Sequence, residues 1–171
     1  MKMKAYAKIA LLLIVVMAIA ACRGAPPAQP PVEDLPLTEI ENRFWLLTEV
    51  RGEDISIAIN RQALAAQGVM TIFTLRLDSN DGTLGGTGSL NAYWGPYALS
   101  PDRSLSFGDI QTTGGESRTV SHLDEEVFLG LLAGVTRWSD MGSNLVLHTS
   151  GHGGVPVTMI FAPPTAFLGG M

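Results

Sequence analysis

Apolar residues recur along most of this chain in short segments, where they alternate with polar or small residues. This alternation is typical of β-strands that turn one face toward a core. Turn-forming residues separate the segments, and Asp81-Gly82 is a strong hairpin signal. The pattern predicts strands over Phe44–Val50, Ile55–Ile59, Val69–Leu77, Thr83–Ser89, Leu90–Leu99, Leu105–Thr112, Val135–Ser139, Leu145–Thr149 and Val155–Phe161.

One segment has a strong helical pattern. Its apolar residues fall on a single stripe at helical spacing: Leu123, Val127, Phe128, Leu131 and Leu132. Ser121 is the expected N-cap, the acidic run 124–126 favours the positive helix start, and Gly134 ends the helix. A brief helix is also predicted over Arg61–Gln67. These elements predict a mainly β (α+β) fold, a curved antiparallel sheet or partly open β-barrel with one packed helix.

The N-terminus has the organisation of a secretory signal. Three lysines precede the run Ile9–Ala21, which holds no polar residue and ends in the small residues that lead to Cys22. The run has 13 residues, whereas a membrane-spanning helix needs roughly 20. Residues 19–22, Ile-Ala-Ala-Cys, resemble the lipobox of bacterial lipoproteins. That resemblance implies cleavage after residue 21, diacylglycerol on the Cys22 thiol and an acylated amine, with palmitate as a typical acyl chain.

Four regions follow from these patterns. Residues 1–21 are the expected lipoprotein signal peptide, and residues 22–37 the lipidated cysteine with a proline-rich, semi-rigid linker. Residues 38–163 are the expected folded domain. Residues 164–171 form an apolar tail that we expect to be loosely ordered.

Charge and cysteine content exclude several functions. All lysines lie in the signal, so the mature chain has eight arginines against sixteen acidic residues, a formal charge of −8. Such a surface disfavours nucleic acid and electrostatic binding to anionic lipid. With Cys22 lipidated, no thiol remains for a disulfide, a metal site or a nucleophile. We therefore expect no cofactor and no metal, and the membrane as a partner through the N-terminal lipid alone.

The central stretch 85–97, GGTGSLNAYWGPY, resembles the core motif of the META domain, the heat-shock HslJ-like family also called DUF306. The matching positions are Gly88, Asn91, Tyr93, Gly95 and Tyr97. Trp45 occupies the family's early Trp-x-Leu place, and Glu126, Phe128 and Leu132 match its helix. Leu90 stands where many members have a cysteine, Glu116 stands near its usual partner, and Glu53–Val69 is longer than the usual loop. The resemblance implies a small β-rich domain, often on envelope lipoproteins, and supplies no catalytic residues.

The same residues have a physical reading apart from the family. Glycines 85, 86 and 88 within a strand indicate a bulge or a close backbone approach. Asn91 tolerates left-handed dihedral angles, and Tyr93 and Tyr97 lie on one side of a strand with Trp94 opposite. We interpret the tyrosines as core residues with accessible hydroxyls, and the alternative is an aromatic platform for a sugar or a peptide.

Catalytic patterns are weak. Ser89 lacks the Gly-x-Ser-x-Gly context, and His122, His148 and His152 have no reliable metal spacing. We therefore expect a non-enzymatic envelope lipoprotein, facing the periplasm or exterior, with a structural, stress-related or binding role and an envelope protein or a small apolar ligand as its possible partner. Two alternatives stay open. An apolar pocket lined by Trp45, Phe73, Phe107 and Trp138 would favour a small-molecule or lipid-binding module. A hydrolase would need a serine or carboxylate beside a histidine in a cleft.

Overall fold

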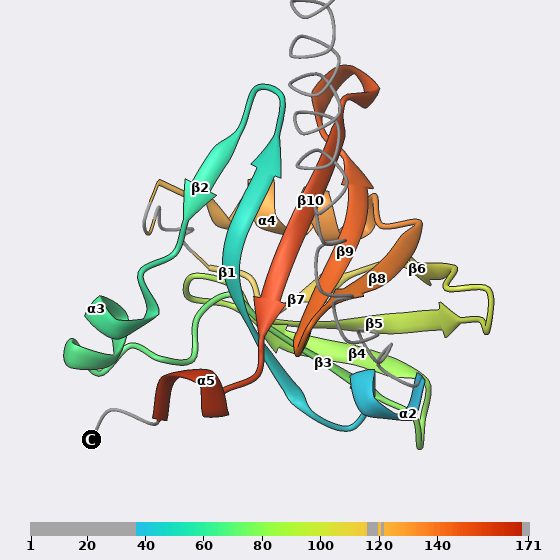
Figure 1. Cartoon of the computed structure of the whole chain (residues 1–171), viewed down its shortest axis with the longest axis horizontal. Helices are drawn as coiled ribbons and strands as arrows, with labels where there is room; N and C mark the ends of the chain where they lie inside the picture. The colour runs from blue at the N-terminus through green and yellow to red at the C-terminus, as the bar shows by residue number, and fades with distance from the viewer. Residues whose placement is uncertain (1–36, 116–119, 121, 169–171) are drawn as a thin grey trace, which may run out of the picture. The chain divides into compact units, whose positions relative to one another are not determined.

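The computed structural model describes residues 37–115, 120 and 122–168 (Figure 1). Cys22, the signal segment and the linker up to residue 36 lie outside the described residues, as do Glu116 and Ser121. The strands are β1 Phe44–Gly52, β2 Ser56–Ala58, β3 Thr74–Asp78, β4 Thr83–Thr87, β5 Ala92–Leu99, β6 Leu105–Phe107, β7 Gln111–Thr112, β8 Arg137–Met141, β9 Asn144–Ser150 and β10 Pro156–Ala162. The helices are α2 Leu37–Ile40, α3 Arg61–Ala66, α4 Glu125–Ala133, α5 Thr165–Leu168 and the 3₁₀ turn η1 His152–Gly154.

The strands of the described residues form one antiparallel sheet, in the order β6-β5-β4-β3-β1-β10-β9-β8. β2 pairs with β1, and β7 pairs with β5. The sheet curls into a barrel that is nearly closed and has one unsealed seam, which confirms the predicted mainly β fold. In Figure 1, β1, β10 and β9 lie steeply, with β10 antiparallel to the other two, and β3, β4 and β5 cross below them. None of the described helices is long and apolar enough to cross a membrane.

The seam lies between β6 and β8, the two ends of the sheet order. A single bridge pairs Ser104 with Arg137, and the Arg103 guanidinium reaches across to Asp140 at 2.9 Å. The same guanidinium lies 5.2 Å from the ring centre of Trp138. Loop contacts and one ion pair therefore hold the two end strands together in place of a ladder.

The core follows the alternation in the sequence. Leu75 and Leu77 of β3 belong to the buried core, and Arg76 and Asp78, which alternate with them, are partly exposed. In β1, Trp45, Leu47 and Val50 are all buried, although the last two are three residues apart. A register shift between Leu47 and Glu49 explains this, because a bulge inserts one residue and restores the inward face. α4 lies behind β1 and β10 in Figure 1 and packs Phe128 against Phe73 with ring centres 5.1 Å apart.

Two local strand predictions need correction. The strand predicted over 69–77 begins only at Thr74, because Phe73 has a φ of 47° and the chain turns before it. The strand predicted over 105–112 is broken into β6 and β7. Residues 165–168 of the tail form the short helix α5.

Candidate functional site

Trp45 and the motif tyrosines Tyr93 and Tyr97 lie in or against the core, whereas Trp94 of the same motif is exposed. Trp45 is buried, and its indole N–H donates to the Ile40 carbonyl at 2.9 Å. Tyr93 is buried, and its hydroxyl donates to the Thr74 carbonyl at 2.5 Å; burial raises its pKa. The Tyr93 hydroxyl is therefore bonded inside the protein, whereas we expected it to be accessible. Tyr97 is half-buried and donates its hydroxyl to the Glu41 carboxylate.

Glu125, the first residue of α4, is 3% exposed and is held by the loop between β4 and β5. One carboxylate oxygen accepts from the Leu90 N–H at 2.8 Å, the Asn91 N–H at 3.2 Å and the Ser89 hydroxyl at 3.0 Å. The other oxygen accepts from the Asn91 side-chain amide at 2.6 Å. The carboxylate thus joins α4 to the centre of the motif, and its acceptor sites are occupied by protein donors.

The same contacts explain Gly88 and Asn91. A Cβ on Gly88 would lie 2.6 Å from the Glu125 carboxylate, so only glycine allows this approach. Desolvation raises the pKa of Glu125, but the hydrogen bonds from Leu90, Asn91 and Ser89 together outweigh it and lower the pKa to about 2. Glu125 is therefore ionised at neutral pH and holds the motif in place, and a general acid would need a raised pKa instead.

The sequence interpretation of this cluster was incomplete. The sequence pattern assigns the run 124–126 to helix-start electrostatics and matches Glu126 to the family's helix, yet Glu126 is exposed and Glu125 is buried. A signal was present: Glu125, Phe128 and Leu132 have the spacing i, i+3, i+7, which puts them on one helical face. A carboxylate on the apolar face of a helix indicates an internal partner.

A second buried charge was missed entirely. Arg61, the first residue of α3, is 3% exposed, and its guanidinium donates to three carbonyls, of Leu47 at 2.7 Å, Ile72 at 2.7 Å and Phe73 at 3.0 Å. Burial lowers the pKa of this guanidinium to about 10. Arg61 therefore fixes the insertion 53–69 and the turn at Phe73 to β1.

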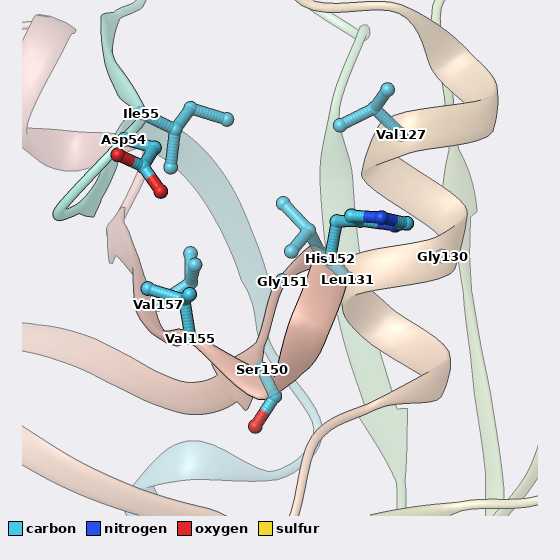
Figure 2. Close-up of a pocket in the computed structure, with 10 residues that line it drawn as sticks. All are labelled: Asp54, Ile55, Val127, Gly130, Leu131, Ser150, Gly151, His152, Val155 and Val157. Atoms are coloured by element: carbon cyan, nitrogen blue, oxygen red, sulfur yellow. The ribbon is translucent and has the colours of Figure 1, made fainter.

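A cavity of about 460 Å³ lies at one end of the barrel (Figure 2). Figure 2 shows three segments around it: the turn after β1, α4, and the connection from β9 to β10. Apolar groups dominate its lining, with the Asp54 carboxylate and the His152 ring as charged or titratable groups. Its residues are Asp54, Ile55, Val127, Gly130, Leu131, Ser150, Gly151, His152, Val155 and Val157. We call it the mouth cavity; the sequence did not predict it.

The sequence left open a ligand pocket in the barrel centre, but side chains fill that space. Trp45, Phe73, Phe107 and Trp138 all belong to the buried core cluster, and none of them lines the mouth cavity. Phe128 of α4 fills the space beside them, packed on Phe73 and edge-on to Tyr93 at 5.8 Å. The space for an apolar ligand is therefore at the barrel mouth and not in the barrel centre.

The histidines do not assemble a site with one another. His148 Nε2 lies 2.7 Å from the Ser139 hydroxyl. Burial lowers the pKa of His148, and the positive charge of Arg137 lowers it further. Both residues are on the outer side of the sheet, since Trp138 and Leu147 between them face the core. His152 lines the mouth cavity, and His122 is exposed with a φ of 66°. Among the described residues, no three His, Cys, Asp or Glu side chains are grouped as metal ligands.

A family model and one solved structure agree with this architecture. The META domain family model matches residues 38–159. An NMR structure of a protein from Burkholderia xenovorans shares the fold with a TM-score of 0.53 and 20% identity, covering 82% of this chain and 96% of that one. A crystal structure of a DUF4847 family protein from Bacteroides vulgatus matches with a TM-score of 0.45 and 16% identity, covering 72% and 93%. No curated protein matches the chain.

Proposed function

This chain belongs to the META domain family, and from that premise we propose that it is a lipid-anchored protein of the bacterial cell envelope whose domain binds a small apolar molecule and is not an enzyme. The anchor is Cys22, and the domain faces the periplasm or exterior. The apolar run before Cys22 and the proline-rich residues after it support the anchor. Two or more acyl chains hold a protein stably at a membrane, whereas one does so only marginally.

The observation that carries the binding role is the mouth cavity. Its volume of about 460 Å³ falls within the roughly 300–1,000 Å³ of small-molecule pockets. Apolar side chains with one carboxylate and one imidazole are the usual composition of such a pocket, since the apolar groups supply affinity and the polar groups orientation.

The mouth cavity lies at the opposite end of β1 from the entry to this strand at Asn42. The Asn42 N–H donates to the Leu77 carbonyl, and the Asn42 amide contacts Ser79, which ties the entry to the turn between β3 and β4. β1 runs nine residues from there to the cavity turn, which corresponds to about 26 Å of strand.

Two features favour binding over catalysis. The Glu125 carboxylate is saturated by four protein donors. The Ser139–His148 pair lines neither the mouth cavity nor any other cavity described for this domain. A hydrolytic site needs the nucleophile and base beside a substrate cleft.

The anchor is tested by the intact mass and membrane partitioning of the native protein beside a Cys22→Ser variant. We expect a mature species that begins at Cys22 with added acyl mass and sediments with membranes, and its loss in the variant. An unacylated or uncleaved native product would overturn the anchor and leave the cavity proposal untouched.

The cavity is tested with N-phenyl-1-naphthylamine, a neutral apolar fluorophore, and a Gly130→Leu variant. A Cβ on Gly130 meets nothing within 4 Å, so the new side chain extends into open space, and replacing glycine in a helix is stabilising by up to about 1 kcal/mol. We expect saturable binding that weakens at least tenfold in Gly130→Leu. Ala133→Leu adds a larger alkyl group to an exposed position of the same helix and should bind as the native protein does.

A native protein with no saturable fluorescence, or with equal binding in Gly130→Leu and Ala133→Leu, would overturn the binding role. The structural or stress-related role predicted from the sequence would then take its place.

A further inference from the structure

A second surface, independent of the mouth cavity, lies on the outer face of β1, β3, β4 and β5. The ladders pair Phe44 with Arg76, Arg76 with Gly85, and Gly85 with Trp94. Directly paired residues of an antiparallel sheet project to the same face. These four residues therefore form one row across the sheet, with an aromatic residue at each end, separated by three strand spacings, or about 14 Å. We call this row and its walls the outer groove.

The two aromatic residues are exposed, which is unusual for side chains of their size. Phe44 is 53% exposed and Trp94 is 48% exposed. Gly85 leaves this row without a side chain on β4. A hollow of about 290 Å³ lies there, lined by Phe44, Trp94, Gly85, Gly86 and neighbouring residues of β3 and β4. A second hollow of about 460 Å³ continues from it past Phe44 and Gly86 toward Met70 and Pro164. Together they make an elongated and shallow groove.

Gly85 and Gly86, at the bottom of the outer groove, differ in how much room each leaves for a side chain. A Cβ on Gly86 would lie 2.1 Å from the Thr74 carbonyl, so packing alone explains Gly86. A Cβ on Gly85 would meet only the Tyr93 carbonyl, at 3.5 Å, which is ordinary contact. Packing therefore does not require glycine at 85, and its effect there is to keep the groove open between Arg76 and Trp94.

The charged groups that line the groove are one cation, Arg76, and one anion, Asp78, in contact with each other. Arg76 Nη2 donates to Asp78 at 2.9 Å, and the guanidinium lies 5.5 Å from the ring centre of Phe44. Arg76 Nε is covered and has no hydrogen-bond partner, which costs free energy unless an acceptor is supplied. Hydrogen bonds from the backbone and side chain of Asn80 lower the pKa of Asp78, so an acceptor carboxylate stands beside the donors of Arg76.

These features discriminate between ligand classes. β3 and β4 are paired on both sides, so an added peptide strand finds no free edge to hydrogen-bond. The paired charges of Arg76 and Asp78 leave no net positive field for phosphates. What remains is a neutral ligand with hydroxyl groups that both donate and accept, and with apolar C–H faces that pack on flat aromatic rings.

We propose that the outer groove binds a neutral oligosaccharide, with sugar rings packed on Trp94 and Phe44 and hydroxyl groups bonded to Arg76 and Asp78. The distance between the aromatic side chains fits a short chain of sugars and exceeds a single ring. The shared chemistry is that of a neutral glycan, either soluble or part of a cell-wall polymer. The proposal does not depend on the mouth cavity or on the lipid anchor.

The test titrates chitohexaose, cellohexaose and maltohexaose into the full-length protein, followed by calorimetry and tryptophan fluorescence. Trp94 is the exposed tryptophan, whereas Trp45 and Trp138 are buried, so a fluorescence change reports on the groove. Trp94→Ala removes one aromatic face, and Gly85→Leu fills the floor without a backbone clash. Met141→Ala removes an exposed apolar side chain from β8, outside the groove, as the matched control.

We expect saturable binding of at least one oligosaccharide, weakened tenfold or more by Trp94→Ala and by Gly85→Leu and unchanged by Met141→Ala. Co-sedimentation with isolated peptidoglycan then identifies a wall glycan as the source, and binding of the soluble chains alone identifies a free oligosaccharide. No binding to any of the three sugars overturns the proposal. The proposal is also overturned if Trp94→Ala and Gly85→Leu both bind as tightly as the native protein while their thermal unfolding is unchanged.

Discussion

Two helices of this domain each begin with a buried charge, and the two charges behave in opposite ways. Glu125 begins α4 and accepts four hydrogen bonds from the loop between β4 and β5. Arg61 begins α3 and donates to three carbonyls. Neither is paired with an opposite charge among the hydrogen bonds and ion pairs described for it. Yet the pKa of Glu125 is lowered, which favours its charged form, and the pKa of Arg61 is lowered too, which disfavours its charged form.

The difference lies in the balance between desolvation and hydrogen bonding. Two N–H groups, a hydroxyl and an amide converge on the small Glu125 carboxylate, and the N-terminal end of α4 adds a favourable dipole. The carbonyls around Arg61 do not recover its hydration, and the N-terminal end of α3 opposes a cation. Glu125 therefore stabilises the fold through its charge, whereas Arg61 stabilises it mainly by satisfying carbonyls that would otherwise be buried without donors.

The largest expected effect is that of Glu125→Gln. Gln has one acceptor oxygen where Glu has two, so its NH2 group must face either the Asn91 side-chain amide or the Leu90 and Asn91 N–H groups. Buried donors then lose an acceptor and the charge is lost as well, and we expect a loss of about 4 kcal/mol in the free energy of unfolding. Urea denaturation followed by tryptophan fluorescence measures it. Glu126→Gln on the exposed side of the same helix should change stability by less than about 0.5 kcal/mol. Equal effects of the two variants would contradict the assigned role of Glu125.

The pH dependence of the free energy of unfolding also tests the role of the Glu125 charge. The pKa of Glu125 is about 2 in the folded protein against an ordinary 4.5. Between these values the unfolded chain binds the proton more readily, so the stability that Glu125 supplies is complete above pH 4.5 and is lost as the pH falls toward 2. The shift corresponds to about 3 kcal/mol.

Unfolding free energies measured from pH 6 to pH 2 should show this fall in the native protein, with a smaller fall in Glu125→Gln. Parallel pH curves for the two proteins would show that other carboxylates account for the acid sensitivity.

Arg61→Met should cost less than Glu125→Gln. The variant leaves the Leu47 and Ile72 carbonyls without the guanidinium, but it also removes a desolvated charge, so we expect a loss of about 2 kcal/mol. Calorimetric unfolding measures it, and Arg51→Met, at an exposed ion pair with Glu49, should lose less than about 1 kcal/mol. A loss for Arg61→Met above that of Glu125→Gln would reverse the comparison.

The smallest expected effect concerns the start of α3. Asn60 Oδ1 accepts from the Ala63 N–H at 2.9 Å and caps this helix. Asn60→Ala should cost about 1 kcal/mol, the usual value for a lost cap. Gln62→Ala, at the exposed second position of the same helix, should cost nothing measurable by thermal unfolding. If Asn60→Ala is also neutral, Arg61 alone fixes α3.

The particular residues show where sequence reasoning succeeded. Alternation placed Trp45 and Leu47 on one buried face, and Asp81-Gly82 marked a true hairpin, because strand periodicity and turn chemistry are local. Gly86 was expected to allow a close backbone approach and does so. The mainly β fold follows from these local signals together with one amphipathic helix.

Other residues show what sequence reasoning could not predict. The break before Thr74 depends on Arg61, twelve residues away from Phe73, whose carbonyl it holds. The outer groove depends on the pairing of Phe44, Arg76, Gly85 and Trp94, which come from four strands. The choice between Glu125 and Glu126 was visible in the helical spacing, yet its meaning depended on donors from residues 89–91.

The sequence by itself determined the strands, the turns, the main helix and the family, because each depends on the types and spacing of residues close together in the chain. Only the tertiary structure decided which charges are buried, which glycines touch a carboxylate and which aromatic residues face outward together. The physical reason is that these properties arise from contacts between segments distant in sequence. Hydrogen bonds, desolvation and cavities exist only once the barrel brings those segments together.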